Sequence, residues 1–175
     1  MLTQCRRAPL AGISTLVLLV LLAACGKPVV VEPPRPMNVT IDIKASTAVN
    51  PDVEGRPSPL AIRVYQLADS ADFMKADLNS LWAGDATILA ETLVSRQEFM
   101  LAPGASAQGS IKLEPATRVL GVVAAFRDFR SATWRTVQPV PQPLGATTEF
   151  VLSVALDVTS VSAQLRPAAD AGAMK

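Results

Sequence analysis

Apolar and polar residues alternate strictly along several short stretches of the chain, a pattern typical of β-strands that bury one face. Residues 38–45 carry their apolar side chains on odd positions, and residues 60–67 restart the alternation on even positions. The stretch 119–126 is continuously apolar, which predicts a strand covered on both faces. Further strands are predicted at 92–101, 110–113, 133–138, 150–158 and 161–165. The last two differ in parity, so a bulge or a turn is expected near residues 159–160.

One segment follows a helical period instead. Met74, Leu78, Leu81 and Trp82 form one apolar stripe, which predicts a helix over about 72–83 that ends at Gly84. We expect this helix to cover one face of the 119–126 strand and the opposite sheet to cover the other face of that strand. Seven or eight short strands with Pro and Gly turns and one helical insertion predict a mostly β, two-sheet β-sandwich.

The strongest apolar run lies near the N-terminus. Residues 10–24 form an apolar run that follows Arg6 and Arg7. The length of this run suits a secretory signal better than a membrane span. The run ends in Leu-Ala-Ala-Cys-Gly, which resembles the bacterial lipobox. This resemblance implies a lipoprotein signal peptide over 1–24 and acylation of Cys25. The Gly after Cys25 replaces the Asp used for inner-membrane retention, which implies sorting to the outer membrane. An ordinary secretory signal that happens to end near a Cys is the alternative.

The predicted domain organisation follows from this processing site. Residues 25–36 would form the lipidated Cys and a Pro-rich tether, extended at about 3.1 Å per residue. Residues 37–166 would form the β-sandwich domain, and 167–175 a flexible tail. Cys5 would leave with the signal, so no disulfide within the mature chain is expected.

Composition narrows the function classes. The chain of 175 residues has 16 Lys+Arg, 15 Asp+Glu and no His, for a formal charge of +1. A near-neutral chain lacks the basic excess of nucleic-acid binders, and the absence of His removes the commonest general base and metal ligand. The basic and aromatic cluster of Arg127, Arg130, Trp134 and Arg135 is therefore interpreted as local pairing with Asp128 and stacking of Arg over aromatic rings.

The remaining polar residues do not form a pattern that indicates a catalytic reaction. No base stands in a recognisable pattern with a Ser or Thr nucleophile. Four carboxylates, Asp69, Asp72, Asp77 and Asp85, lie on and around the predicted helix, where helix capping and an exposed face explain them. The segment 104–109 lacks a phosphate-loop Lys and is interpreted as a hairpin connection. We predict no catalytic residue, no metal site, no cofactor and no small-molecule substrate.

The segment 46–59 is the best candidate for recognition. It places fourteen residues between two predicted strands, where hairpin connections usually take two to five. Its prolines would reduce the ordering cost of binding, and its polar side chains offer contacts. The predicted partner-binding residues are Val49, Asn50, Pro51, Asp52, Val53, Glu54, Gly55, Arg56, Pro57 and Ser58. A loop without a function is the alternative.

The stretch Val-Asn-Pro-Asp-x-x-Gly-Arg-Pro-Ser-Pro-Leu-x-Ile-Arg-Val-Tyr-Gln-Leu, residues 49–67, resembles the signature of the type VI secretion system lipoproteins called TssJ, also SciN or VasD. Residues 73–82, 98–104 and 120–128 agree with the family in the same order. The resemblance implies a transthyretin-like two-sheet sandwich with an added helical element, anchored by acyl chains in the outer membrane and facing the periplasm. It also implies binding to the periplasmic C-terminal domain of the inner-membrane component TssM, and assembly of a trans-envelope complex. The family's recognised contact is the loop after the first strand, which here is 46–59.

A second function stays open. A periplasm-facing lipoprotein of this fold could instead bind a soluble ligand or inhibit an envelope enzyme.

Overall fold

The structure, a computed structural model, describes residues 37–142 and 149–171. The predicted signal peptide, Cys25 and the tether lie outside the described residues. None of the helices in the described part of the chain is long and apolar enough to cross a membrane.

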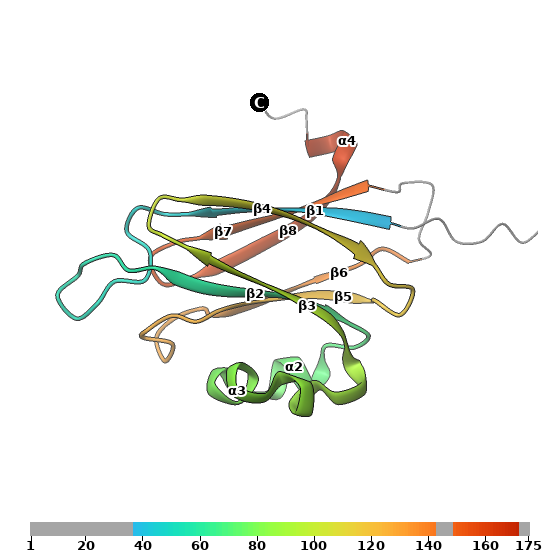
Figure 1. Ribbon diagram of the computed structural model, residues 1–175, viewed down its shortest axis with the longest axis horizontal. Helices are drawn as coiled ribbons and strands as arrows, with labels where there is room; N and C mark the ends of the chain where they lie inside the picture. Colours follow the sequence, from blue (N-terminus) through green and yellow to red (C-terminus); the bar gives the residue numbers. More distant parts are fainter. Residues whose placement is uncertain (1–36, 143–148, 172–175) are drawn as a thin grey trace, which may run out of the picture. The chain divides into compact units, whose positions relative to one another are not determined.

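Two four-stranded sheets pack face to face, as predicted (Figure 1). Sheet A has the order β4-β1-β7-β8 and is formed by β1 (Met37–Ala45), β4 (Ser106–Leu113), β7 (Glu149–Leu156) and β8 (Val161–Pro167). Sheet B has the order β3-β2-β5-β6 and is formed by β2 (Leu60–Leu67), β3 (Leu93–Leu101), β5 (Val119–Ala124) and β6 (Arg135–Pro139). Neighbouring strands are antiparallel, except that β1 and β7 are parallel.

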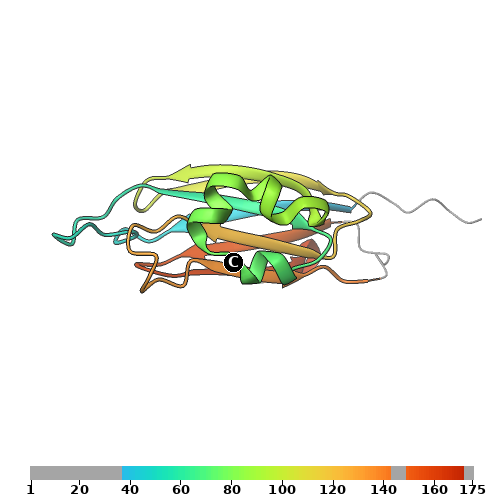
Figure 2. The ribbon, with the colours of Figure 1, turned by 90° about the horizontal axis from the view of Figure 1, so that it is seen from below.

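Helical elements cover the outer face of sheet B, as Figure 2 shows. They are α2 (Ala71–Lys75), α3 (Leu78–Leu89) and the 3₁₀ turn η1 (Ala90–Thr92). A further short helix, α4 (Ala168–Ala171), follows β8 within the segment predicted as a tail.

The core follows the alternation of the sequence. Val39, Ile41 and Ile43 of β1 are fully buried between the sheets. In β5, Val122 faces the sandwich interior and Val123 packs against the helices, so the prediction of a strand covered on both faces is confirmed.

The helical insertion differs from the single helix predicted. Ala76 adopts an extended backbone with ψ of 148°, which ends α2, and the Asp77 carboxylate then caps α3 by accepting a hydrogen bond from Ser80 N at 3.0 Å. Gly84 interrupts α3 with φ −154° and ψ 45°, but the helix continues to Leu89. Met74, predicted on the buried stripe, is 43% exposed, because the break at residue 76 resets the helical phase.

A close approach brings the helices onto the sheet. A Cβ on Gly121 of β5 would lie 2.8 Å from Cζ of Phe73 in α2, so only glycine leaves room for this ring. The Phe73 ring also meets Tyr65 edge-on, with centroids 5.6 Å apart. These contacts seat α2 directly on β2 and β5.

The structure differs from the predictions at two connections. The segment 104–109 is not a hairpin connection, because β3 belongs to sheet B and β4, which already begins at Ser106, belongs to sheet A. The alternation of β7 ends at Leu156, and Val158 is 40% exposed instead of buried. The parity change expected near 159–160 is confirmed as a turn, in which Asp157 N donates to Ser160 O at 2.8 Å.

Asp85 is buried, contrary to its interpretation as part of an exposed helical face. Its side chain accepts hydrogen bonds from Tyr65 Oη at 3.0 Å and Arg63 Nη1 at 3.3 Å, and it pairs with Arg96. Arg63 also donates to Glu98 at 2.8 Å. Burial, reinforced by the Asp85 charge, raises the pKa of Tyr65 to about 12. This cluster ties α3 to β2 and β3.

Candidate functional site

Three connections meet at one end of the sandwich (Figure 1). They are residues 46–59 between β1 and β2, which we call the arm, the β5–β6 connection at 125–134, and the β7–β8 turn at 157–160. The pairing of Ala45 with Leu156 and of Ile62 with Ala124 brings the ends of the corresponding strands together. The arm projects beyond the strands at this end.

Asn50 joins the three connections. Its backbone N donates to Val158 O at 2.9 Å, its Nδ2 donates to Pro59 O at 2.8 Å, and its Oδ1 accepts from Arg127 N at 2.9 Å. The residue is 4% exposed and has φ of 52°, a left-handed backbone that Asn tolerates better than other residues with a side chain. Asn50 therefore fixes the base of the arm against both neighbours.

The Asp52 carboxylate organises the outer half of the arm. Its Oδ1 accepts from the backbone N of Glu54 and of Arg56, both at 2.9 Å, and its Oδ2 accepts from Arg56 Nε at 2.8 Å. These hydrogen bonds, with Arg56 the main donor, lower the pKa of Asp52 below its usual value. Gly55, with φ of 81°, completes the turn. The polar groups of the arm thus cross-link its outer half.

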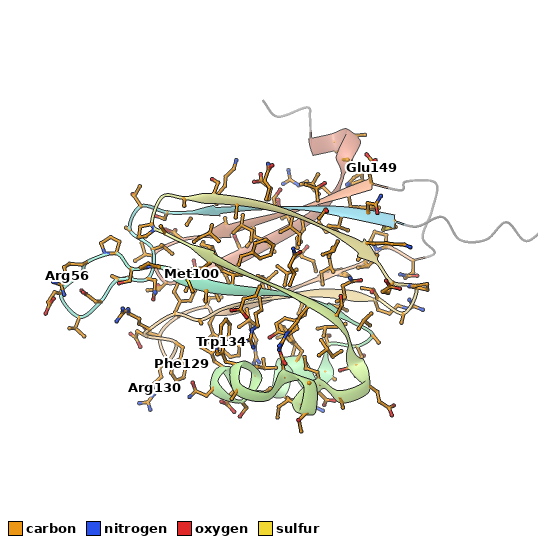
Figure 3. All side chains as sticks on the ribbon, in the orientation of Figure 1. Arg56, Met100, Phe129, Arg130, Trp134 and Glu149 are labelled. Carbon is orange, nitrogen blue, oxygen red and sulfur yellow. The ribbon has the colours of Figure 1, made fainter. Side chains whose placement is uncertain are left out.

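The tip of the arm presents an apolar side chain beside a pair of charges. Val53 is 101% exposed. Arg56, which Figure 3 shows at the outermost point of the arm, pairs with both Asp52 and Glu54. A fully exposed valine on an ordered loop is available for burial against another surface.

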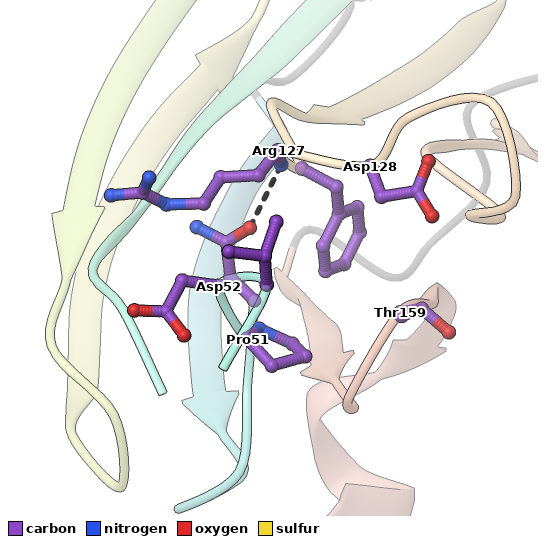
Figure 4. Close-up of a pocket in the computed structure, with 8 residues that line it drawn as sticks. Pro51, Asp52, Arg127, Asp128 and Thr159 are labelled. Carbon is purple, nitrogen blue, oxygen red and sulfur yellow. Dashed lines mark hydrogen bonds between the residues drawn. The ribbon is translucent and has the colours of Figure 1, made fainter. Parts of the chain in front are cut away.

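A pocket of about 520 Å³ lies between the arm and the two neighbouring connections (Figure 4). The arm side contributes Asn50, Pro51, Asp52 and Val53, and the opposite side contributes Phe126, Arg127, Asp128 and Thr159. The arm and the pocket together form a surface suited to holding part of another molecule.

The predicted site residues divide into two groups. Val49, Asn50 and Ser58 are buried and hold the arm in place, while most of the others lie at least partly at its surface. The prediction missed the opposite wall of the pocket.

The interpretation of the Arg and aromatic cluster is correct for Arg135, whose guanidinium lies 4.6 Å from the Trp134 ring centroid. Among the described residues, no ion pair joins Arg127 or Arg130 to Asp128.

The part of the chain that the structure describes offers no group of three or more His, Cys, Asp or Glu side chains that could hold a metal ion. Among the polar side chains that line the pocket, Asn50 and Asp52 are hydrogen-bonded to backbone groups, and Arg127, Asp128 and Thr159 are exposed.

Comparison with known proteins agrees with this description. The profile of the family described as "Type VI secretion lipoprotein, VasD, EvfM, TssJ" matches residues 37–159. No curated protein matches the chain.

Three solved structures are similar over nearly their whole length. The T6SS lipoprotein TssJ1 from Pseudomonas aeruginosa is 34% identical, with a TM-score of 0.70 over 77% of this chain and 99% of that one. Lip from Serratia marcescens, described as a membrane bound component of the type VI secretion system, is 26% identical, with a TM-score of 0.69 over 74% and 97%. A chain in the structure of the T6SS protein TssM C-terminal domain from EAEC is 26% identical, with a TM-score of 0.58 over 73% and 97%.

Proposed function

Because the chain belongs to the type VI secretion lipoprotein family, we propose that it binds the periplasmic C-terminal domain of an inner-membrane TssM-type partner. Through this contact it would help to assemble the trans-envelope complex of the secretion system. The observation that carries the proposal is the ordered arm, which projects at the position where the family resemblance places the partner contact. The similarity to a chain in the structure of the TssM C-terminal domain supports the choice of partner.

The physical properties of the arm suit this role. Asn50 and Asp52 hold it in place, so less conformational freedom is lost on binding than in a flexible loop. Val53 supplies an apolar contact at the tip, and the pocket behind it offers a concave surface. The family consists of secretion lipoproteins and not of enzymes, and we assign the chain no catalytic activity, no cofactor, no nucleic acid and no small-molecule substrate.

Replacing Val53 with aspartate is expected to weaken partner binding by more than about tenfold, because a charge would have to be desolvated at the centre of the contact. The measurement is the binding of the full chain, kept in a mild detergent, to the immobilised periplasmic C-terminal domain of the partner. Val53 is 101% exposed, so the fold should be unaffected. Ile88→Asp, at a 39% exposed position of α3 away from the arm, is the matched control. Equal affinity of V53D and the unchanged chain would contradict the proposed site.

We also propose that Cys25 carries acyl chains that anchor the chain in the outer membrane, facing the periplasm. The proposed division is a signal peptide over 1–24, the lipidated Cys and tether over 25–36, the sandwich over 37–166 and a tail over 167–175. The description of the similar Lip protein as membrane bound supports attachment to a membrane. Several acyl chains, each stabilised by about 0.8 kcal/mol per buried CH₂, would make the attachment stable.

Cys25→Ser is expected to move the chain from the membrane fraction to the soluble periplasm, because the serine hydroxyl cannot be acylated as the thiol is. Fractionation and mass spectrometry of the N-terminus would measure the change. Cys5→Ser is the matched control and should have no effect, since Cys5 would leave with the signal. A C25S protein that still sediments with outer membranes would rule out this anchor.

A further inference from the structure

A second pocket, of about 380 Å³, lies between α3 and the β5–β6 connection. Leu78 and Trp82, one helical turn apart, and Ala83 line it from α3, and Phe126 and Phe129 line it from the connection. Figure 3 shows Phe129 close to the helices that cover sheet B. The walls are therefore mostly aromatic and aliphatic.

The second pocket lies next to the pocket at the arm. Phe126 lines both pockets, so the β5–β6 connection is a wall that the two pockets share. This shared wall is fixed in place. Arg127 N is hydrogen-bonded to Asn50 on one side, and Thr133 N donates to Thr159 O at 2.9 Å on the other. The second pocket is therefore a neighbour of the surface that the arm presents.

The arm alone is too small to form a stable protein contact. A specific interface usually involves about 20–30 residues on each side. The arm has fourteen residues, of which Val49, Asn50 and Ser58 are buried within the domain. The contact must therefore extend over neighbouring surface, and an apolar pocket on the other side of the shared wall is well suited to receive an anchoring side chain.

We propose that the TssM-type partner inserts one apolar side chain, aromatic or branched, into the second pocket while another part of the same domain rests on the arm. This inference rests on the proposed function and extends it from one pocket to two. The pocket is organised before binding, because the Arg63 guanidinium lies 4.0 Å from the Trp82 ring centroid and donates to the Trp82 carbonyl at 2.9 Å. Both contacts hold Trp82 in position at the pocket wall.

The test is to fill the pocket from an exposed position of the helix. Ala83 is exposed on α3 and lines the pocket, so Ala83→Trp should occupy the space without disturbing the core. Ala86→Trp, at an exposed position of the same helix that lines neither pocket, is the matched control. The full chain in mild detergent is titrated against the partner's periplasmic domain, and circular dichroism checks the fold of each variant. We expect A83W to bind at least tenfold more weakly than the unchanged chain, and A86W to bind within about twofold of it.

The outcomes separate the two proposals. If V53D weakens binding but A83W does not, or if A83W and A86W weaken it equally, the second pocket takes no part and this inference is overturned. If the unchanged chain does not bind the domain, the proposed function fails. If it binds and neither V53D nor A83W weakens binding, the partner uses another surface and both assignments are wrong.

Discussion

Replacing Asp85 with alanine is expected to lower the free energy of unfolding by about 3–5 kcal/mol. The Asp85 side chain is 3% exposed and is the buried anionic partner of Arg63, whose own side chain is 10% exposed. Its removal leaves that guanidinium, among the described residues, with Glu98 as its one charged partner, and it deprives the Tyr65 hydroxyl of its acceptor. Since domains of this size are stable by only about 5–15 kcal/mol, the loss would be large. Urea denaturation of the full chain in mild detergent measures it.

Two variants show whether burial is the cause. Asp85→Asn keeps an acceptor for Tyr65 but removes the charge, and we expect an intermediate loss. Asp72→Ala, at an exposed position in α2, should change stability by less than about 1 kcal/mol, as is usual for exposed pairs. A D85A protein as stable as D72A would show that the buried cluster contributes little.

Tyr65, the only tyrosine, gives a spectroscopic measure of the same cluster. Its pKa of about 12 in the folded chain exceeds the value near 10 expected when unfolded. Because the folded pKa is raised, this stabilisation is complete below pH 10 and is lost as the pH rises from 10 towards 12. Asp85→Ala removes a negative charge beside the phenol, so the absorbance of the tyrosinate should develop at a lower pH than in the unchanged chain. A shift in the opposite direction would contradict the assigned contacts.

Asn50→Ala is the second substitution with a large expected effect, a destabilisation of about 2–5 kcal/mol. The change leaves Arg127 N and Pro59 O without their side-chain partners, and the loss of these hydrogen bonds costs about 1–3 kcal/mol of stability. It also places alanine at φ of 52°, which costs about 1–2 kcal/mol. Chemical denaturation measures the loss, and amide hydrogen exchange at Arg127 should become faster because its hydrogen bond is gone.

Asn50→Gly separates the two contributions. Glycine accepts the left-handed backbone, so N50G should lose only the side-chain hydrogen bonds and be more stable than N50A. Both variants should bind the partner more weakly, because the arm is no longer fixed to the β5–β6 connection. Stability of N50A within about 0.5 kcal/mol of the unchanged chain would show that Asn50 does not organise the arm.

Much of the fold could be predicted from local periodicity. The alternation of apolar residues in β1 and β2 and the continuous apolar run of β5 are direct consequences of which faces they bury. The break between α2 and α3 could not be predicted this way, because it depends on the Asp77 carboxylate accepting from Ser80 N in place of a continued helix. Nor does periodicity say which sheet a strand joins, so it cannot distinguish the crossing from β3 to β4 from a hairpin.

Only the arm side of the candidate site, which is one continuous segment of sequence, could be predicted. The length of the segment 46–59 pointed to the arm. The opposite wall of the pocket, at Phe126 and Arg127, is joined to the arm by a hydrogen bond to Asn50 across 77 positions of sequence. The burial of Asp85 is unpredictable for the same reason, since the side chains that pair with it lie on β2 and β3.

The place of β1 in sheet A has a consequence for the kinetics of folding. β1 is the first strand of the domain but lies between β4 and β7, and Asn38 pairs with Glu149. Pairings so distant in sequence close large loops, and domains dominated by them fold in milliseconds to seconds. Until β7 is available, one edge of β1 has no neighbour, and its apolar face is incompletely covered. A nascent or truncated chain that ends before residue 149 should therefore be a substrate for chaperones and prone to aggregation.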